Sequence, residues 1–467
     1  MIVQRARARA ALLALALGAT GLPPAGTQAQ ARTGAALVEA LDSAARAHVE
    51  HAMVPGVSVA VVRDGEPLLQ RGYGFADLEW RVPTPADGGA SYEIGSITKQ
   101  FTAAVVLQLA EQGKVDLDAD FTTYVAFDTK GRTVPVRRLL DHTSGIKGYT
   151  EMPAFGELSV RDLPRDSLLR LVEKEAFDFE PGTALIYNNS AYFLLGLVIE
   201  EVTGKTYEAV VEEMIFDPIG MEDSYYCSEF EVRADRAHGY DAAGPTRLVR
   251  ARYLDHTWPY AAGSLCSTVA DLVRWNRALH GGQVLSPESY RAMTTPAPLE
   301  DGTEVRYAMG LGVDEVQGRR SITHGGGING FLSDGRYYPD EDLIVVVLQN
   351  STGPRGPAGL GSALAELVLG PLPEPLAERA YEGDLGELTG TYSGPARGRP
   401  MTIDVLVEDG RLALRICEQP PQMPRYVGDM RWREGGILAS FVRRDGEVAE
   451  LRFDQGGGHY VLRRTGG

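Results

Sequence analysis

Cysteine is scarce in this chain, and its scarcity excludes a fold held together by disulfides. The 467 residues contain three cysteines, Cys227, Cys266 and Cys417, which are too few for a disulfide framework. Cys227 and Cys266 are able to pair in an oxidising compartment, although the sequence does not give their separation in space. The cysteine and histidine spacings form no metal-ligand cluster. We therefore expect no metal and no cofactor, and a structural role for His142, His238, His256, His280 and His459.

Positive charge is also in short supply, which limits the classes of partner. Lys and Arg number 46 against 63 Asp and Glu, giving a formal net charge of −17. Such acidity argues against nucleic acid or an anionic membrane surface as the main partner. The acidic residues are dispersed, as on a solvated surface. We expect the partner to be a small-molecule or peptide-like substrate, and the sequence leaves the oligomeric state open.

Long hydrophobic runs are likewise rare. Ala10 to Ala19 is apolar, but a helix needs about 20 such residues to span a bilayer. Three arginines precede this run and Ala29-Gln30-Ala31 follows it, which is the pattern of a secretory signal with a cleavage site. No cysteine precedes Cys227, which excludes a lipid-anchoring cysteine beside the signal. We expect residues 1–31 to be a signal peptide and the mature protein to be secreted or periplasmic in a bacterium, without a stable membrane anchor.

The order of patterns along the chain predicts an α/β protein of the α+β type. Alternating runs from Val57 to Val62 and from Leu68 to Gly74 flank Asp64-Gly65, which is a hairpin signature. Helical patterns dominate from Thr98 to about Leu279, and Leu343 to Leu348 is an apolar strand. We expect both ends of this segment to share one antiparallel sheet flanked by helices, with an all-helical region between them.

A proline-rich stretch after an apolar helix ending near Leu369 divides the chain. Beyond it, short alternating runs separated by Gly, Pro or Asp-Gly turns predict a small antiparallel barrel or sandwich. These runs are 390–394, 401–407, 411–416, 438–443, 448–453 and 460–463. The expected organisation is a signal peptide at 1–31, a large domain at 32–370, a linker at 371–383 and an all-β domain at 384–467.

Ser96-Ile97-Thr98-Lys99 opens a segment rich in helix formers. Residues at i and i+3 share a helix face, so Ser96 and Lys99 are expected to point into the same space. Ser96 would lie in the first turn, where backbone N–H groups without intrahelical partners can bind an anion. A serine with a nearby amine can become a nucleophile. The simpler alternative is a helix start at which Ser96 or Thr98 acts as the cap.

Two further segments carry polar residues suited to catalysis. Tyr187 and Asn189 lie on a short polar stretch before an apolar helix expected from Leu194. As an ordinary loop, this stretch would pack Tyr187 and use Asn189 to cap the helix. His324 begins a glycine run after a strand-like segment, where glycines would let another molecule's backbone approach a sheet edge.

These three segments, in this order, resemble the serine beta-lactamase and penicillin-binding-protein family, specifically its class C-like branch. Ser96 and Lys99 match the S-x-x-K motif, Tyr187 and Asn189 match Y-x-N, and His324 and Gly326 match a [KH]-x-G strand. The resemblance covers roughly Leu37 to Leu369. It implies the beta-lactamase/transpeptidase-like fold, with 32–370 as the catalytic domain. The tail resembles the lipocalin-like domains found on some members.

The resemblance also implies a role for each matched residue. Ser96 would be the nucleophile of an acyl transfer, with Lys99 or Tyr187 as the base that takes its proton. Asn189 would orient the substrate and Lys99, and the backbone N–H groups of Ser96 and Gly327 would form the oxyanion hole. His324 and Gly326 would contribute to substrate binding.

Gly325, Gly327 and Gly330 also satisfy the dinucleotide-binding pattern G-x-G-x-x-G. That pattern requires a following helix, whereas Leu332 to Pro339 is a turn-forming sequence. We reject the nucleotide-binding interpretation.

The sequence therefore predicts a secreted serine hydrolase that cleaves an ester or amide through an acyl-enzyme on Ser96. His324 stands where the true lactamases have a lysine, and histidine is mostly neutral at pH 7. Esterase or D-amino-acid peptidase activity is thus favoured over dedicated beta-lactamase activity. The alternative is a non-catalytic binding or scaffold protein that retains the penicillin-binding fold.

Overall fold

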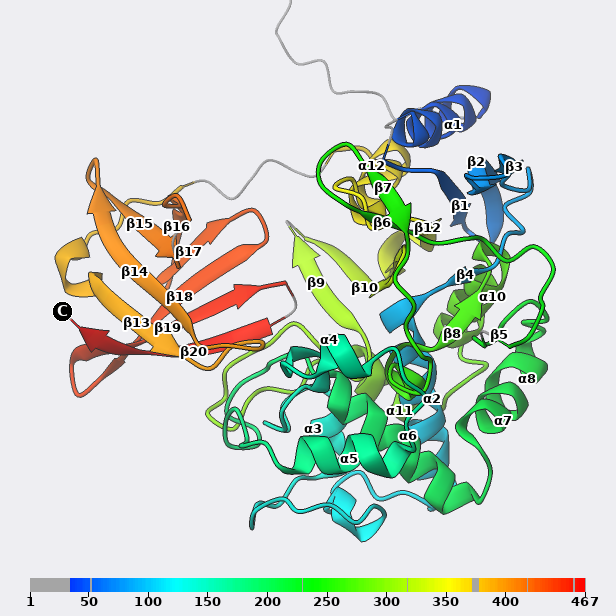
Figure 1. Ribbon diagram of the computed structural model, residues 1–467. Helices are drawn as coiled ribbons and strands as arrows, with labels where there is room; N and C mark the ends of the chain where they lie inside the picture. Colours follow the sequence, from blue (N-terminus) through cyan, green and yellow to red (C-terminus); the bar gives the residue numbers. More distant parts are fainter. Residues whose placement is uncertain are drawn as a thin grey trace, which may run out of the picture.

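The computed structural model describes residues 34–50, 53–228, 230–316, 318–371, 378–417, 419–456 and 458–466 (Figure 1). The expected signal peptide at 1–31 and residues 372–377 of the expected linker lie outside the described residues. The described part contains a mixed α/β portion followed by an all-β barrel, which confirms the predicted fold class.

A seven-stranded antiparallel sheet forms the centre of the α/β portion. Its strand order is β3-β2-β1-β12-β11-β10-β9. As predicted, the N-terminal hairpin lies beside the C-terminal strands, because β1 pairs with β12 from Val57–Gln349 to Arg63–Leu343. Asp64 and Gly65 take positive φ angles of 51° and 76° in the hairpin turn. The strands are β1 Gly56–Arg63, β2 Glu66–Asp77, β3 Val82–Pro83, β9 Gly312–Val316, β10 Arg319–Ile328, β11 Phe331–Tyr338 and β12 Leu343–Gln349.

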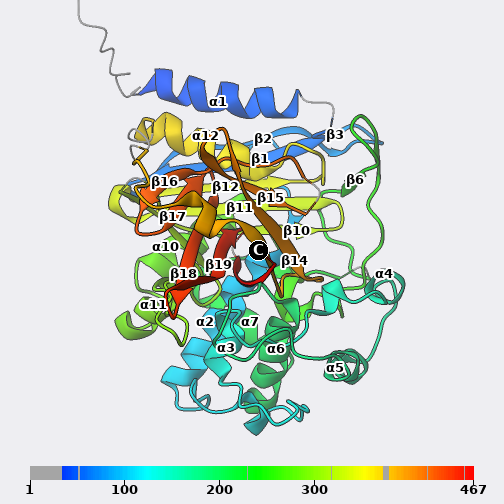
Figure 2. The same cartoon turned by 90° about the vertical axis from the view of Figure 1, so that its left-hand side faces the viewer.

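Helices cover both faces of this sheet (Figure 2). Leu41 of α1 (Ala35–Val49) and Leu364 of α12 (Pro357–Leu369) pack with Val59 on one face. The larger cluster on the other face joins the sheet to α10 (Val269–His280) and to the helical region. Burial of these apolar side chains is the main force that fixes the sheet against its helices.

The helical region is built around α2 (Thr98–Glu111) and α6 (Asn189–Thr203), both almost wholly buried. Short strands β4 Tyr92–Glu93, β8 Leu265–Ser267 and β5 Tyr225–Tyr226 form a small sheet, and β6 Tyr240–Ala242 pairs with β7 Leu248–Arg250. The other helices of this part are α3 Val136–Leu140, α4 Phe155–Leu158, α5 Arg165–Glu173, α7 Tyr207–Val211, α8 Asp217–Ile219, α9 Tyr260–Gly263 and α11 Pro287–Thr294. Single turns are η1 Gly95–Ile97, η2 Phe121–Thr123, η3 Tyr149–Glu151, η4 Glu212–Phe216 and η5 Pro339–Glu341.

The C-terminal part is a nearly closed eight-stranded barrel with strand order β15-β14-β13-β20-β19-β18-β17-β16. All six predicted strands are present, but β16 and β17 were not predicted. Both strands are only four residues long, and β17 has one apolar residue among two arginines and a glutamate, so neither shows a clear alternation. After η6 Leu385–Leu388, the strands are β13 Gly390–Gly394, β14 Met401–Glu408, β15 Arg411–Ile416, β16 Arg425–Gly428, β17 Arg431–Glu434, β18 Ile437–Arg444, β19 Glu447–Gln455 and β20 Gly458–Gly466.

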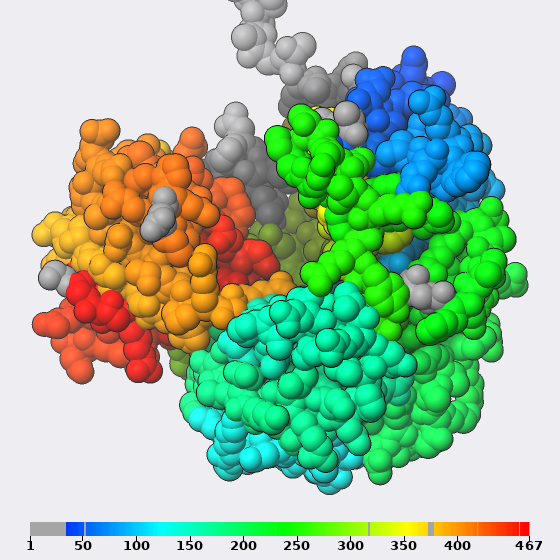
Figure 3. Space-filling view, viewed as in Figure 1, coloured from blue at the N-terminus to red at the C-terminus, as the bar shows by residue number. Residues whose placement is uncertain are grey.

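The barrel packs directly on the α/β portion, and the space-filling view shows a hollow between the two (Figure 3). Leu185 and His459 exchange backbone hydrogen bonds of 3.2 and 2.8 Å. Ile186, the next residue, is buried in the barrel's own hydrophobic core. Arg452 of β19 forms an ion pair with Asp301 across the same junction. The segment that ends at Tyr187 is therefore held from both sides.

Candidate active site

Ser96 lies in η1, a single 3₁₀ turn, and α2 begins at Thr98. Ser96 therefore lies in the 3₁₀ turn that precedes the α-helix, rather than in the first turn of the helix itself. Gly95 holds a φ of 52°, and a methyl group on it would lie 2.9 Å from the backbone nitrogen of Gly327. The η1 turn therefore lies directly against β10, and only glycine fits at its first position.

Neither Ser96 nor Thr98 caps α2 through its side chain. The Thr98 hydroxyl instead accepts a hydrogen bond from the backbone N–H of Leu265, at 3.1 Å. The simpler interpretation of the first motif, a serine or threonine cap, is wrong. Ser96 is left free to face the pocket described below.

Lys99 lies on the same side of the helix as Ser96, as the spacing predicts. Its Nζ is within hydrogen-bond distance of Ser96 Oγ at 3.1 Å, Asn189 Oδ1 at 2.8 Å and the Ala262 carbonyl at 2.7 Å. The side chain is completely buried. Burial lowers the pKa of Lys99 well below its usual value, and the Arg397 guanidinium lowers it further, while Glu151 acts in the opposite direction.

Asn189 is available to contact Lys99 because its neighbour Asn188 caps the N-terminus of α6 (Asn189–Thr203). The Asn188 side chain accepts from the backbone N–H of Ala191 at 2.9 Å, and α6 begins at Asn189 rather than at Leu194. Asn189 therefore has its amide oxygen on Lys99 and its Nδ2 donating to Thr150 Oγ1 at 3.1 Å. The prediction that Asn189 itself would cap the helix in an ordinary loop is wrong.

Tyr187 lies beside both residues of the first motif. Its ring centre is 4.8 Å from Lys99 Nζ. Burial raises the pKa of the Tyr187 phenol, and the adjacent Ser96 hydroxyl and the Arg397 guanidinium offset part of the rise. Within the described residues the Tyr187 hydroxyl has no partner at hydrogen-bond geometry, so the Ser96 contact is one of proximity. A buried, unsatisfied hydroxyl at this place is available to a substrate.

The third motif lies on β10, at the point where β9 stops pairing with it. The β9–β10 register ends at Gly312–Thr323, so from His324 onward this edge of β10 has no strand beside it. A methyl group on Gly326 would lie 2.0 Å from the Ile94 carbonyl oxygen. Gly326 and Gly327 thus bring an open strand edge against η1, a segment of the same chain, whereas the sequence predicted the approach of another molecule's backbone.

His324 is held as a neutral ring. Its Nδ1 lies 2.6 Å from the Gly325 carbonyl, which only accepts, so Nδ1 carries the proton. Its Nε2 then accepts from the Tyr307 hydroxyl at 3.0 Å. Burial lowers the pKa of His324 to about 3.

These groups surround one pocket with a volume of about 740 Å³. Six of the seven predicted site residues line it, and Lys99 lies behind them, in contact with Ser96. Arg397 and Gly456 of the barrel also line this pocket, which the sequence did not predict. The lining members of the predicted set are Ser96, Tyr187, Asn189, His324, Gly326 and Gly327.

A second group of residues, missed by sequence reasoning, supports the pocket wall. The His142 ring lies 4.4 Å from the Tyr187 ring and 4.7 Å from that of Tyr307, centre to centre. His142 Nδ1 accepts from the backbone N–H of Asn188 at 3.1 Å. The structural role predicted for His142 is thus specific: it positions the loop that carries Tyr187 and Asn189.

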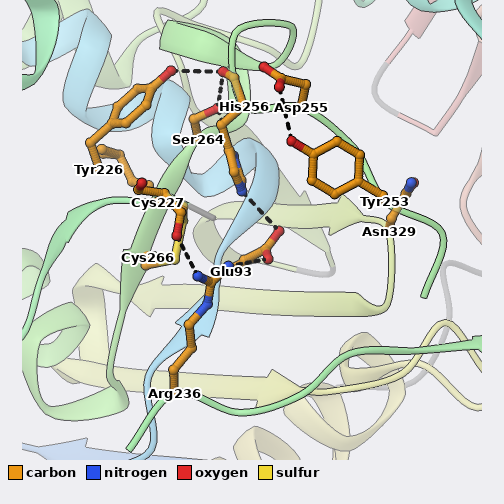
Figure 4. Close-up of polar contacts among 12 residues, drawn as sticks. Glu93, Tyr226, Cys227, Arg236, Tyr253, Asp255, His256, Ser264, Cys266 and Asn329 are labelled. Carbon is orange, nitrogen blue, oxygen red and sulfur yellow. Dashed lines mark hydrogen bonds and ion pairs between the residues drawn. A yellow bond between two sulfur atoms is a disulfide. The ribbon is translucent and has the colours of Figure 1, made fainter. Parts of the chain in front are cut away.

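The segment that supplies the Ala262 carbonyl is braced by a disulfide and a polar network (Figure 4). Cys227 and Cys266 are bonded, and the backbone N–H of Cys227 donates to the Ser264 carbonyl at 2.8 Å. The Ser264 hydroxyl donates to the His256 carbonyl at 2.9 Å, which also accepts from Tyr226 at 2.7 Å. Cys417, the third cysteine, is unpaired and exposed.

Two searches of the described residues give negative results. No cluster of three or more His, Cys, Asp or Glu side chains there is arranged to hold a metal ion. Among the same residues, no helix has both the length and the apolar character needed to cross a membrane. The glycine run of the third motif continues into the β10–β11 hairpin. Leu332 to Tyr338 belong to strand β11, so the prediction of a turn over Leu332 to Pro339 is wrong, and the helix that the dinucleotide-binding pattern requires does not follow the run.

Comparison with known proteins agrees with this geometry. A D-aminopeptidase from Brucella anthropi is 28% identical over 402 residues, covering 85% of this chain and 74% of that protein. The solved D-amino acid amidase from Ochrobactrum anthropi SV3, in complex with D-phenylalanine, has a TM-score of 0.61 and 27% identity, covering 72% of this chain and 98% of that one. The octameric penicillin-binding protein homologue from Pyrococcus abyssi has a TM-score of 0.65 and 26% identity, covering 91% and 100%. Residues 41–369 match the family model described as Beta-lactamase. The chain therefore belongs to the beta-lactamase family of serine hydrolases.

Proposed function

We propose that this protein hydrolyses small esters or D-amino-acid amides and peptides through an acyl-enzyme on Ser96. The observation that carries the proposal is the contact of Ser96 Oγ with a completely buried lysine amine, 3.1 Å away, at the wall of a large pocket. A serine hydroxyl becomes an effective nucleophile only when a base accepts its proton.

Lys99 is the first base in this proposal. A neutral amine has two N–H donors and one lone pair, and Lys99 Nζ has three polar neighbours. Asn189 Oδ1 and the Ala262 carbonyl only accept, so the two N–H groups point to them and the lone pair faces Ser96 Oγ. The lowered pKa of Lys99 favours this neutral form at pH 7, whereas the raised pKa of Tyr187 keeps the phenol protonated.

Tyr187 then acts as the proton carrier on the leaving-group side. Its hydroxyl is adjacent to Ser96, buried and without a partner among the described residues. It would deliver a proton to the departing nitrogen or oxygen and later help to deprotonate the attacking water. Positioned proton transfer of this kind typically contributes a factor of about 10² to 10⁴ in rate.

The oxyanion formed on the scissile carbonyl would be held by the backbone N–H groups of Ser96 and Gly327. Support comes from the close approach of η1 to the open edge of β10. Removing one such donor typically costs about 3 kcal/mol of transition-state stabilisation.

The substrate class follows from His324 and from the relatives. A lysine at this position would supply a fixed cation, but His324 is a neutral acceptor for Tyr307. The D-aminopeptidase and the D-amino acid amidase share the fold and are named for D-amino-acid substrates. Ester or D-amino-acid amide hydrolysis is therefore favoured over dedicated beta-lactamase activity. The scaffold alternative is disfavoured because all the motif side chains meet at one pocket.

We also propose that the protein acts outside the cytoplasm. The predicted signal at residues 1–31 supports this location. The Cys227–Cys266 bond supports it independently, since disulfides persist in oxidising compartments.

Labelling with a fluorophosphonate and a substrate panel test the proposal. Intact-mass analysis should show one adduct on the wild type and none on Ser96→Ala. Turnover of p-nitrophenyl acetate or D-phenylalanine amide should exceed that of nitrocefin in kcat/KM. Equal labelling of Ser96→Ala would remove Ser96 as the nucleophile, and a folded wild type that takes no label would favour the scaffold alternative. Faster turnover of nitrocefin would contradict the substrate class.

A further inference from the structure

The barrel places an arginine in the active-site pocket. Arg397 lies in the connection between β13 and β14 and lines the same pocket as Ser96. Its guanidinium carbon is 5.2 Å from the centre of the Tyr187 ring. The side chain is 46% exposed, so it is accessible to a ligand in the pocket.

The guanidinium of Arg397 is hydrogen-bonded through Nε, whereas its two Nη groups are available. Arg397 Nε donates to Glu151 Oε1 at 2.6 Å, and the Thr150 hydroxyl donates to the same oxygen at 2.8 Å. Within the described part of the chain, neither Nη group of Arg397 takes part in a hydrogen bond. The ion pair with Glu151 therefore orients the arginine and leaves two Nη groups for another acceptor.

The pocket offers no competing permanent cation. Among its described lining residues Arg397 is the only lysine or arginine. Lys99 lies behind Ser96, and both ring nitrogens of His324 are already used. A guanidinium matches a carboxylate with two parallel N–H···O bonds, which an amide of the same shape cannot reproduce.

We propose that Arg397 binds a carboxylate of the substrate, about one residue from the scissile carbonyl. The inference rests on the proposed hydrolase function and deepens it. The preferred substrates are then D-amino-acyl peptides with a free C-terminal carboxylate rather than their C-terminal amides. The barrel thereby supplies the cation that the third motif lacks.

A binding measurement on a non-hydrolysing background tests this without relying on turnover. In Ser96→Ala, calorimetry should show that D-alanyl-D-alanine binds at least about tenfold more tightly than D-alanyl-D-alanine amide, the scale expected of a charge-assisted pair. Adding Arg397→Ala should remove this preference by weakening binding of the acid and leaving the amide within about twofold. Arg397→Lys should restore part of the preference, because it keeps the charge without the planar fork.

Arg431→Ala is the matched control, since Arg431 is an exposed barrel arginine whose ion pair with Asp429 lies within the barrel and outside the pocket lining. It should leave the acid-to-amide ratio unchanged. The inference is overturned if the Ser96→Ala protein binds acid and amide equally, or if Arg397→Ala weakens both alike. Failure of the hydrolase function would appear separately, as absence of fluorophosphonate labelling in the wild type with Arg397 intact.

Discussion

The Tyr307 hydroxyl donates to His324 Nε2 at 3.0 Å, and this bond keeps the third-motif histidine neutral. Protonation at Nε2 would turn this acceptor into a donor and require the Tyr307 hydroxyl to rotate and accept instead. The ring is also buried, and its pKa is lowered to about 3. A charged His324 that attracts substrate carboxylates therefore has no support in this geometry.

A stability measurement checks the state of His324. Between pH 6.5 and about 3 the unfolded chain binds a proton at this residue and the folded chain does not, so the contribution of His324 to folding falls as pH falls. The His324→Gln variant lacks this pH dependence. For one proton, the dependence amounts to about 1.4 kcal/mol of unfolding free energy per pH unit. Urea unfolding at pH 7, 6, 5 and 4 should show that the free energy of unfolding of the wild type, relative to that of His324→Gln, decreases as the pH falls.

Burial also lowers the pKa of His280, and this contribution is the same in both proteins and cancels in the comparison. Burial is the largest cause of the lowered pKa of His142, and only the smaller part caused by the charge of His324 differs between the two proteins. A wild-type advantage that stayed constant from pH 7 to pH 4 would mean that His324 titrates normally.

Asn189→Asp tests whether the neutral amine of Lys99 limits the reaction. The amide oxygen of Asn189 lies 2.8 Å from Lys99 Nζ, so a carboxylate there would stabilise the ammonium form and raise its pKa. Activity requires the free amine, and the acid limb of kcat/KM should therefore move to higher pH by about 1 unit or more. The measurement is a pH–rate profile on a neutral ester.

Thr150→Val serves as the control for that experiment. It removes the hydrogen bonds of Thr150 with Asn189 Nδ2 and with Glu151 and leaves every charge in place, so the limb should stay where it is. An unshifted limb in Asn189→Asp would show that another group sets the acid limb.

The residues proposed to carry the chemistry could be selected from the sequence, because each motif is a local pattern of side chains. The contacts among them are not local: Lys99 meets Asn189 across 90 residues and Ala262 across 163. Arg397 belongs to no motif and reaches the pocket only through docking of the barrel. The start of α6 was predicted too late, at Leu194, because its first turn carries the polar residues Asn189 and Ser190, which are also common in loops.

Gly326→Ala should disrupt the site, whereas Gly325→Ala should not. A methyl group on Gly326 would lie 2.0 Å from the Ile94 carbonyl and 2.3 Å from Ser333 Oγ, so β10 must move away from η1. The nearest atom to a methyl group on Gly325 is 3.3 Å away. Backbone shifts of this kind typically cost about 1–3 kcal/mol, and kcat/KM of Gly326→Ala should fall at least about tenfold. Equal activity of the two variants would mean that the β10–η1 approach is not needed for turnover.

The Cys227–Cys266 bond should stabilise the fold much more than it affects the chemistry. The bond spans 39 residues, for which the chain-entropy model gives about 4 kcal/mol of stability. Cys227→Ala/Cys266→Ala should therefore lower the thermal midpoint clearly under non-reducing conditions, and reducing agent should do the same to the wild type but not to the variant. At 25 °C kcat should stay within about twofold, because α9, which carries the Ala262 carbonyl, also packs against α2 and α6 and so has support besides the bond. Cys417→Ala, which removes the exposed free thiol, is the matched control and should change neither quantity.

If the double variant has the same thermal midpoint and kcat as the wild type, the two cysteines are not bonded in solution. If its kcat falls while its thermal midpoint stays the same, the bond positions Lys99 through Ala262.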